Sequence, residues 1–322
     1  MMLHHKSFRD FMSRALYHPE TGYYMQKTHP ASMAGDYITA SQHPLFAACM
    51  ARHLARMCAG IEHPALADVG AGSGIFLLNL IRFLEKDDPA FLDRLSFFAV
   101  EKIRRFEHPR VKILQDISEL PMLEGCIFSF ELFDALPCHE LVSTSDGLKE
   151  LFVDGEKFVE GPVSDERLPA FLDRFNVKMQ NGQRAEVCLY AEPLYGIMAS
   201  KLTRGSLLTF DYGARASTLY RSSLYPSGTL MCHSKHTFDR EVLKDPGSRD
   251  ITYAVNFTGL LEKGERLGLI TQDFKSLSAF LSEAGAGLPH DLLQEKDPFP
   301  ARDLLFGTIG QDLKLLSQSR LD

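Results

Sequence analysis

One stretch of the sequence, residues 64–101, constrains the fold more than any other. Its apolar run P-A-L-A-D-V leads into the turn G-A-G-S-G at 70–74, and the runs I-F-L-L-N-L-I-R-F-L and L-S-F-F-A-V-E follow. The order strand, glycine turn, helix, strand is typical of a parallel βαβ unit. Further short apolar runs that we expect as strands are V-K-I-L, C-I-F-S-F and S-L-L-T-F-D-Y. The sequence therefore predicts a doubly wound α/β sheet whose ligand lies at the carboxyl ends of the strands.

Several segments do not follow this alternation of strand and helix. The run S-F-R-D-F-M-S-R-A-L-Y places apolar residues on one helical face behind a serine N-cap, and a second helix is expected at about 44–59. Two later segments, one rich in strand-like sequence and the other interrupted by glycines and prolines, are expected at the open edge of the sheet. Folds of this kind bind their ligands at that edge. The expected parts are an N-terminal helical extension with a lid at 1–60, a core at 61–322, and insertions at about 139–190 and 214–255.

Composition excludes some partners and compartments. The 322 residues carry a formal charge of -7, so the field of the whole chain would repel nucleic acid and anionic membranes. The six cysteines never form C-x-x-C, which indicates a reducing compartment. No apolar run reaches the roughly 20 residues of a membrane span, and the first residues do not resemble a signal or transit peptide. The sequence as written predicts a cytoplasmic protein, and a mitochondrial one only if a transit peptide is missing from it.

The glycine turn is compatible with two classes of cofactor. A Gly-x-Gly-x-Gly turn between strand and helix lets a ligand approach the backbone at a helix N-terminus. A nicotinamide dinucleotide brings a pyrophosphate to such a turn, whereas S-adenosylmethionine brings an amino acid whose ammonium group needs an anionic partner. Asp68, just before the turn, supplies such an anion, and Glu101, at the end of the next strand, can accept hydrogen bonds from a ribose diol. The motif favours S-adenosylmethionine and leaves an oxidoreductase as the rival.

A series of ordered motifs resembles one family over about residues 7–316. The motifs are A-L-Y-H-P-E-T-G-Y-Y, G-D-Y-I-T-A, D-V-G-A-G-S-G, E-L-F-D-A-L-P, F-D-Y-G, G-T-L-M-C-H-S-K-H, D-P-G-S-R-D-I-T with V-N-F, and I-T-Q. In these motifs the chain resembles the MidA-like methyltransferases, a family that includes a mitochondrial complex I assembly factor acting as a protein arginine methyltransferase. The resemblance implies a class I methyltransferase fold, which is Rossmann-like with a seven-stranded, mostly parallel sheet, and S-adenosyl-L-methionine as cofactor.

The resemblance also implies which residues bind the cofactor. It assigns the loop to Asp68, Gly70, Gly72 and Gly74, the ribose to Glu101, and the adenine amine to Asp116. Gly35 and Asp36, in G-D-Y-I-T, are expected to fold over the cofactor as a lid, with a plain turn as the alternative.

The motif E-L-F-D-A-L-P suggests where a methyl acceptor is held. An arginine guanidinium is always protonated and presents five donors, so carboxylates are needed to hold it. Glu131 and Asp134, three residues apart after a strand, are the candidate catalytic pair; their alternatives are a solvated acid and a helix cap. His139 and His236 are candidates for lining the acceptor pocket. No metal site is expected, because C-H-S-K-H offers no fourth ligand.

The sequence therefore predicts a methyltransferase that acts on an arginine of a protein partner, and the resemblance suggests a subunit of respiratory complex I as that partner. The alternatives are a methyltransferase for a small molecule and an assembly protein that binds the cofactor without transferring a methyl group. The chain departs from the family pattern at Phe130, where an asparagine is usual, and at Ser41 to His43. The C-terminal pattern at 304–316 predicts the last helix and strand of the core, or a surface that forms a homodimer.

Overall fold

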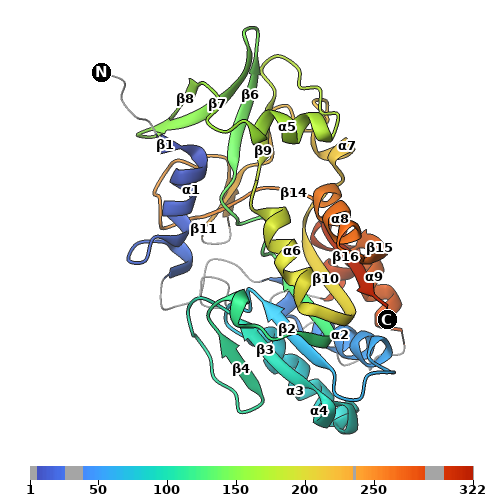
Figure 1. Ribbon diagram of the computed structural model, residues 1–322. Coiled ribbons are helices and arrows are strands. Elements are labelled where there is room, and N and C mark those ends of the chain that lie inside the picture. The colour runs from blue at the N-terminus through green and yellow to red at the C-terminus, as the bar shows by residue number, and fades with distance from the viewer. Residues whose placement is uncertain (1–5, 26–38, 235–236, 287–300, 322) are drawn as a thin grey trace. The chain divides into compact units, whose positions relative to one another are not determined.

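The strands and helices divide between two compact units, each assembled from three separate stretches of the chain. Unit 1 comprises 1–26, 133–193 and 213–260, and unit 2 comprises 27–132, 194–212 and 261–322. The computed structural model describes residues 6–25, 39–234, 237–286 and 301–321 of these stretches (Figure 1). The segments expected as insertions at 139–190 and 214–255 fall in unit 1 together with the first 26 residues.

Unit 2 is built on a mostly parallel sheet with seven strands along its path. In spatial order the strands are β15 (Ile270–Ser276), β16 (Leu313–Arg320), β10 (Leu202–Ala214), β5 (Leu123–Phe130), β2 (Ala65–Val69), β3 (Ser96–Val100) and β4 (Val111–Leu114). The five from β10 to β4 are parallel, and β16 is antiparallel to both of its neighbours. This arrangement confirms the predicted seven-stranded α/β sheet, and the order of its strands reverses direction between β2 and β5.

Helices pack on both faces of this sheet, because strands buried on two sides need apolar cover on each. The helices of unit 2 are α2 (Pro44–Met57), α3 (Ile75–Asp87), α4 (Pro89–Arg94), α9 (Leu277–Ala284), α10 (Ala301–Phe306) and α11 (Thr308–Asp312), with short 3-10 turns η2 (Ala40–Gln42) and η3 (Ile117–Glu119). Two further helices, α6 (Ala191–Lys201) and α8 (Phe257–Arg266), begin in unit 1 and end in unit 2. The helix expected at about 44–59 is α2, and its buried face contributes to a large apolar cluster.

The two faces of the sheet differ in chemistry. One face carries the large apolar cluster, in which Phe46 of α2 meets five other phenylalanine rings. On the other face the fully buried amide of Gln318 accepts a hydrogen bond from the hydroxyl of Tyr195 at 2.8 Å and donates to the carbonyl of Leu261 at 2.9 Å. Because a buried amide is stable only when it is hydrogen-bonded, Gln318 fixes α6 and α8 against β16.

Unit 1 contains two antiparallel sheets. The larger one orders its strands β1 (Lys6–Ser7), β7 (Gly147–Asp154), β6 (His139–Thr144) and β9 (Arg184–Val187), with β8 (Lys157–Gly161) paired to β7. The smaller one consists of β12 (Thr237–Asp239), β11 (Met231–Ser234) and β13 (Asp250–Thr252), and β14 (Val255–Asn256) pairs with the end of β10. The helices of unit 1 are α1 (Phe8–Tyr17), α5 (Arg167–Arg174) and α7 (Ala216–Leu219), with the 3-10 turn η1 (Tyr23–Met25). The predicted N-cap of the first helix is confirmed, since the Ser7 hydroxyl accepts a hydrogen bond from the Asp10 amide.

We expect Phe46→Ala to destabilise the protein by about 3–5 kcal/mol, because it removes a fully buried ring and leaves a cavity among aromatic neighbours. Urea denaturation followed by circular dichroism measures this change. Phe306→Ala is the matched control, because that ring is 81% exposed, and its effect is expected to stay within about 0.5 kcal/mol. A loss below about 1 kcal/mol for Phe46→Ala would contradict the packing described here.

Candidate functional site

The glycine turn between β2 and α3 adopts a conformation that requires glycine. Gly70 and Gly74 have φ values of 81° and 73°, in the left-handed region that other residues rarely adopt. A side chain would also collide there: a Cβ on Gly74 would lie 2.5 Å from the ring of Phe106, and one on Gly70 would lie 3.0 Å from Leu132. The turn is held in place because the Gly70 amide donates to the carbonyl of Val100 at 2.9 Å. The glycines therefore let Phe106 and Leu132 pack directly against the backbone of the turn at the N-terminus of α3, the place where turns of this kind bind ligands.

Glu101 follows β3 and is hydrogen-bonded to the glycine turn. Its Oε2 accepts a hydrogen bond from the Gly72 amide at 3.0 Å. Its Oε1 accepts one from the Ile103 amide and one from Nη1 of Arg105, both at 3.2 Å. Glu101, which is predicted to bind the ribose, is thus hydrogen-bonded directly to the loop that is predicted to bind the cofactor.

Asp68 lies in β2, two residues before the turn, and is only 3% exposed. Burial, together with a smaller contribution from the negative charge of Glu101, raises the pKa of its carboxyl group to about 8. A carboxyl group in this state is largely protonated near neutral pH and becomes an anion when a cation is brought beside it. The side chain is therefore suited to a ligand that carries an ammonium group.

Asp116 has a structural role that the sequence analysis did not assign. Its carboxylate caps η3 by accepting a hydrogen bond from the Ser118 amide at 2.8 Å, and Glu119 completes the capping box. The hydrogen bonds from Ser118 lower the pKa of this exposed carboxyl group. Contact between Asp116 and an adenine stays a prediction.

Glu131 directly follows β5, the strand next to β2, and its backbone is strained. Its φ of 49° is left-handed, which is uncommon for a residue other than glycine and concentrates at functional sites. The conformation is held because the Glu131 amide donates to the carbonyl of Phe210 at 2.9 Å. Glu131 therefore stands at the carboxyl edge of the sheet, beside the strand that leads into the glycine turn.

Asp211, the acid of the motif F-D-Y-G, has a structural role that the sequence does not predict. This fully buried carboxylate accepts hydrogen bonds from the Leu132 amide at 3.1 Å and from the Tyr212 amide at 2.9 Å. Leu132 in turn contacts Gly70. Asp211 thus connects the ends of β10 and β5 to the glycine turn, and an acid at the end of an apolar strand was the only signal available for it.

Asp134 belongs to unit 1, because the boundary between the units falls between Leu132 and Phe133. It is buried, and its carbonyl accepts a hydrogen bond from the Tyr253 amide at 3.1 Å. The hydroxyl of Tyr253 donates to the carbonyl of Phe133 at 2.9 Å. The joint action of Glu131 and Asp134 on an acceptor stays a prediction.

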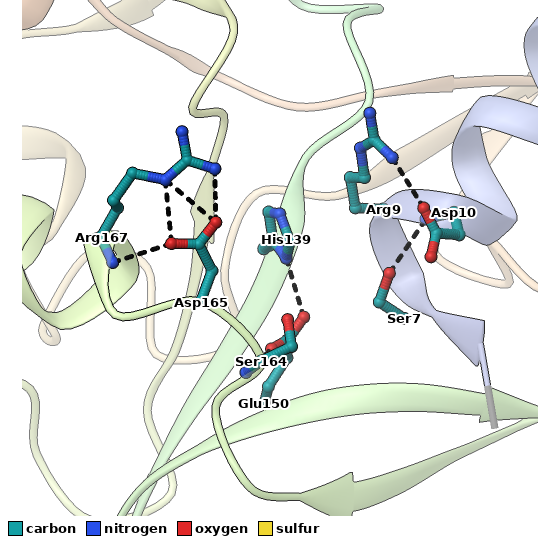
Figure 2. Close-up of polar contacts among 8 residues, drawn as sticks. All are labelled: Ser7, Arg9, Asp10, His139, Glu150, Ser164, Asp165 and Arg167. Atoms are coloured by element: carbon teal, nitrogen blue, oxygen red, sulfur yellow. Dashed lines mark hydrogen bonds and ion pairs between the residues drawn. The ribbon is translucent and has the colours of Figure 1, made fainter. Parts of the chain in front are cut away.

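His139 of β6 pairs with an acid of the neighbouring strand (Figure 2). Its Nδ1 lies 2.7 Å from Oε1 of Glu150, whose side chain is fully buried and also accepts a hydrogen bond from the Ser164 amide. Burial raises the pKa of Glu150, but the hydrogen bonds from His139 and Ser164 outweigh it and leave a net lowering. The pair orients the imidazole within unit 1, and a role for His139 in binding an acceptor stays a prediction.

The remaining predicted residues, Gly35, Asp36 and His236, lie outside the described residues. Within the described ranges no three His, Cys, Asp or Glu side chains form a group suited to a metal ion. In the same part of the chain, none of the helices combines the length and the apolar composition needed to cross a bilayer.

Unit 1 encloses a cavity of about 20 Å³ that is lined in part by Glu186 and Glu192. Both acids are already engaged: Glu186 accepts hydrogen bonds from Thr229 and the Leu230 amide, and Glu192 is paired with Arg174. A cavity of this size holds about one water molecule. It is therefore too small to be a second ligand site.

Comparison with known proteins agrees with the cofactor chemistry of unit 2. Protein arginine methyltransferase NDUFAF7, mitochondrial, of Xenopus tropicalis is 28% identical over 233 residues, which are 64% of this chain and 50% of that protein. The Mus musculus protein of the same name is 23% identical, covering 92% of this chain and 75% of its own length. This chain therefore spans about half the length of the Xenopus tropicalis relative.

A solved structure and a family model extend the comparison. A crystal structure of a Burkholderia thailandensis protein bound to S-adenosyl-homocysteine has a TM-score of 0.82 and 27% identity, covering 98% of this chain and 87% of that one. A family model described as an S-adenosyl-L-methionine-dependent methyltransferase matches residues 46–275. Because this match extends over well more than half of the chain, the protein belongs to the family of S-adenosyl-L-methionine-dependent methyltransferases.

Proposed function

We propose that this methyltransferase transfers its methyl group to an arginine side chain of a protein partner. The observation that carries the proposal is Glu131, a carboxylate residue in strained backbone conformation at the carboxyl end of β5. Strand β5 lies beside β2, which leads into the glycine turn. The relatives of this chain in Xenopus tropicalis and Mus musculus are named protein arginine methyltransferases, which supports this choice of acceptor.

The residues of unit 2 fit the cofactor. When bound, S-adenosyl-L-methionine supplies a methyl group that is already activated on a sulfonium. Gly70 and Gly74 form the left-handed turn at the N-terminus of α3, Asp68 provides a buried carboxyl for the ammonium group, and Glu101 accepts hydrogen bonds from the ribose. Because the methyl group is already activated, the protein mainly has to orient the acceptor and exclude water.

The acceptor chemistry requires acids on the protein. A guanidinium is protonated at any physiological pH and presents five N–H donors in a plane, so carboxylates are the side chains that can orient it. Glu131 accepts these hydrogen bonds and takes the proton that the guanidinium loses once it is methylated. The sequence offers Asp134 as the second acid of the pair, and His139 and His236 as candidates for lining the acceptor pocket.

Mass spectrometry tests the acceptor. Incubation with isotope-labelled S-adenosyl-L-methionine and a lysate that lacks this protein is expected to label arginine in at least one protein. Glu131→Gln is expected to lower the rate of labelling by about 10²–10³-fold, because the acceptor loses its charged partner, while S-adenosyl-homocysteine still binds. Glu124→Gln, an exposed acid at the other end of β5, is the matched control and should keep the wild-type rate.

Asp134→Asn is expected to lower the rate in the same way, with the exposed Asp146→Asn as its control in unit 1. Label on a small molecule, on another side chain, or on nothing at all would contradict an arginine acceptor. Full activity of both acid variants would contradict the assigned pair.

Calorimetry at about pH 6.5 tests the role of Asp68. At that pH the donor already carries its ammonium group, because α-amino groups titrate near 7.7–8.0. Asp68 is protonated in the free protein, since its pKa is raised to about 8, and it ionises when the ammonium group is placed beside it. We therefore expect binding to release about one proton, measured as a dependence of the binding enthalpy on the ionisation enthalpy of the buffer.

The Asp68→Asn variant should release no proton from this position, whereas Asp87→Asn, an exposed acid at the end of α3, should behave like the wild type. A binding enthalpy that is the same in all buffers for the wild type would show that Asp68 does not ionise on binding.

A further inference from the structure

The segment that connects β3 to β4, residues 101–110, covers the cofactor loop without forming a helix. The ring of Phe106 lies directly against Gly74, where an added Cβ would be only 2.5 Å away. This contact anchors the segment at the N-terminus of α3. The preceding residue, Arg105, is almost completely buried, with 5% of its side chain exposed.

Arg105 directs its guanidinium at the acid that is expected to hold the ribose. Its Nη1 lies 3.2 Å from Oε1 of Glu101, and only 16% of the Glu101 side chain is exposed. An ion pair so little exposed to water is screened weakly, so it holds the carboxylate in one orientation.

The hydrogen bonds on Glu101 leave room for only part of a ribose diol. Each carboxylate oxygen has two lone pairs, and a diol donates two hydrogen bonds. The Gly72 amide uses one lone pair of Oε2, while the Ile103 amide and Arg105 together use both lone pairs of Oε1. A hydroxyl that approaches Oε1 must therefore displace a donor, and of the two donors there the guanidinium is the one on a flexible side chain.

We propose that Arg105 is a positioning residue that acts through Glu101 and competes with one ribose hydroxyl of the cofactor for Oε1. In the free protein the guanidinium keeps the carboxylate paired, and on binding it yields its position to the hydroxyl. The protein consequently binds the cofactor less tightly than it would if Glu101 were not paired with Arg105, because this ion pair must open before the ribose can bind. The proposal rests on the cofactor and is independent of the acceptor.

Titration calorimetry with S-adenosyl-homocysteine and with S-adenosyl-L-methionine tests this competition. Arg105→Met removes the donors while keeping a long buried side chain, and we expect it to bind both ligands about tenfold more tightly than the wild type, a change of about 1.4 kcal/mol. Arg105→Lys keeps a cation that can pair with Glu101 and should restore an affinity close to that of the wild type. Arg104→Met is the matched control, because Arg104 is the neighbouring residue, is 60% exposed and pairs with Glu107, and it should change nothing.

The sign of the effect separates competition from a structural role. A residue that only stabilised the segment would, when replaced, lower both the melting temperature and the affinity. Unchanged or weaker binding of both ligands by Arg105→Met would overturn the proposal. Tighter binding of S-adenosyl-L-methionine alone would also overturn it, because that pattern indicates repulsion between Arg105 and the sulfonium charge.

A crystal structure of the wild-type protein with S-adenosyl-homocysteine tests the proposal without any variant. We expect the distance between Nη1 of Arg105 and Oε1 of Glu101 to lengthen from 3.2 Å to beyond about 3.5 Å, outside hydrogen-bonding range. An intact ion pair with both ribose hydroxyls on Glu101 would overturn the competition.

Discussion

The hydrogen bond between the Gly72 amide and the Glu101 carboxylate is the interaction on which the arrangement of the site depends. It joins the turn after β2 to the end of β3, so the two segments to which we assign cofactor binding are held together. It also fixes a negative charge near Asp68, and this charge contributes to the raised pKa of that buried acid. Two acids at the ends of adjacent strands thus create a site that favours a ligand carrying positive charge.

The parallel strands of unit 2 could be predicted because each is a short, continuous apolar run, as strands buried on both faces require. The edge strand β15 gave no such signal, because most of its residues are partly exposed and its sequence, I-T-Q-D-F-K-S, is mainly polar. The antiparallel strands of unit 1 were recognised only where apolar residues gathered, as in β6 and β7. Residues 1–26 belong to the same unit as these strands, and β1 joins their sheet through the pairing of Lys6 with Val153. No local sequence pattern predicts a pairing between such distant positions.

The same difference applies to the residues of the site. Local sequence predicts the positions of some of them, whereas contacts between distant parts of the chain determine the others. The positions of Gly70 and Gly74 in the turn after β2, and of Glu101 after β3, could be predicted, because both follow from the order of strands and helix along the sequence. The contact between Arg105 and Glu101 could not be predicted, because the sequence K-I-R-R-F-E does not distinguish Arg105 from Arg104. Only in the folded segment is Arg105 buried and Arg104 exposed. Asp211 shows the same limit: its hydrogen bond to the Leu132 amide spans 79 positions of the sequence.

The division of each unit into three stretches of chain bears on how the protein emerges from the ribosome. Unit 1 is complete in sequence at Leu260, whereas unit 2 needs the strands β15 and β16 near the C-terminus. The strands β2, β3, β4 and β5 are synthesised early. Their sheet lacks its antiparallel strands, β15 and β16, until the last fifth of the chain has been synthesised. Until β16 has been synthesised, the edge of β10 that pairs with it has no partner, and an open strand edge of this kind favours aggregation.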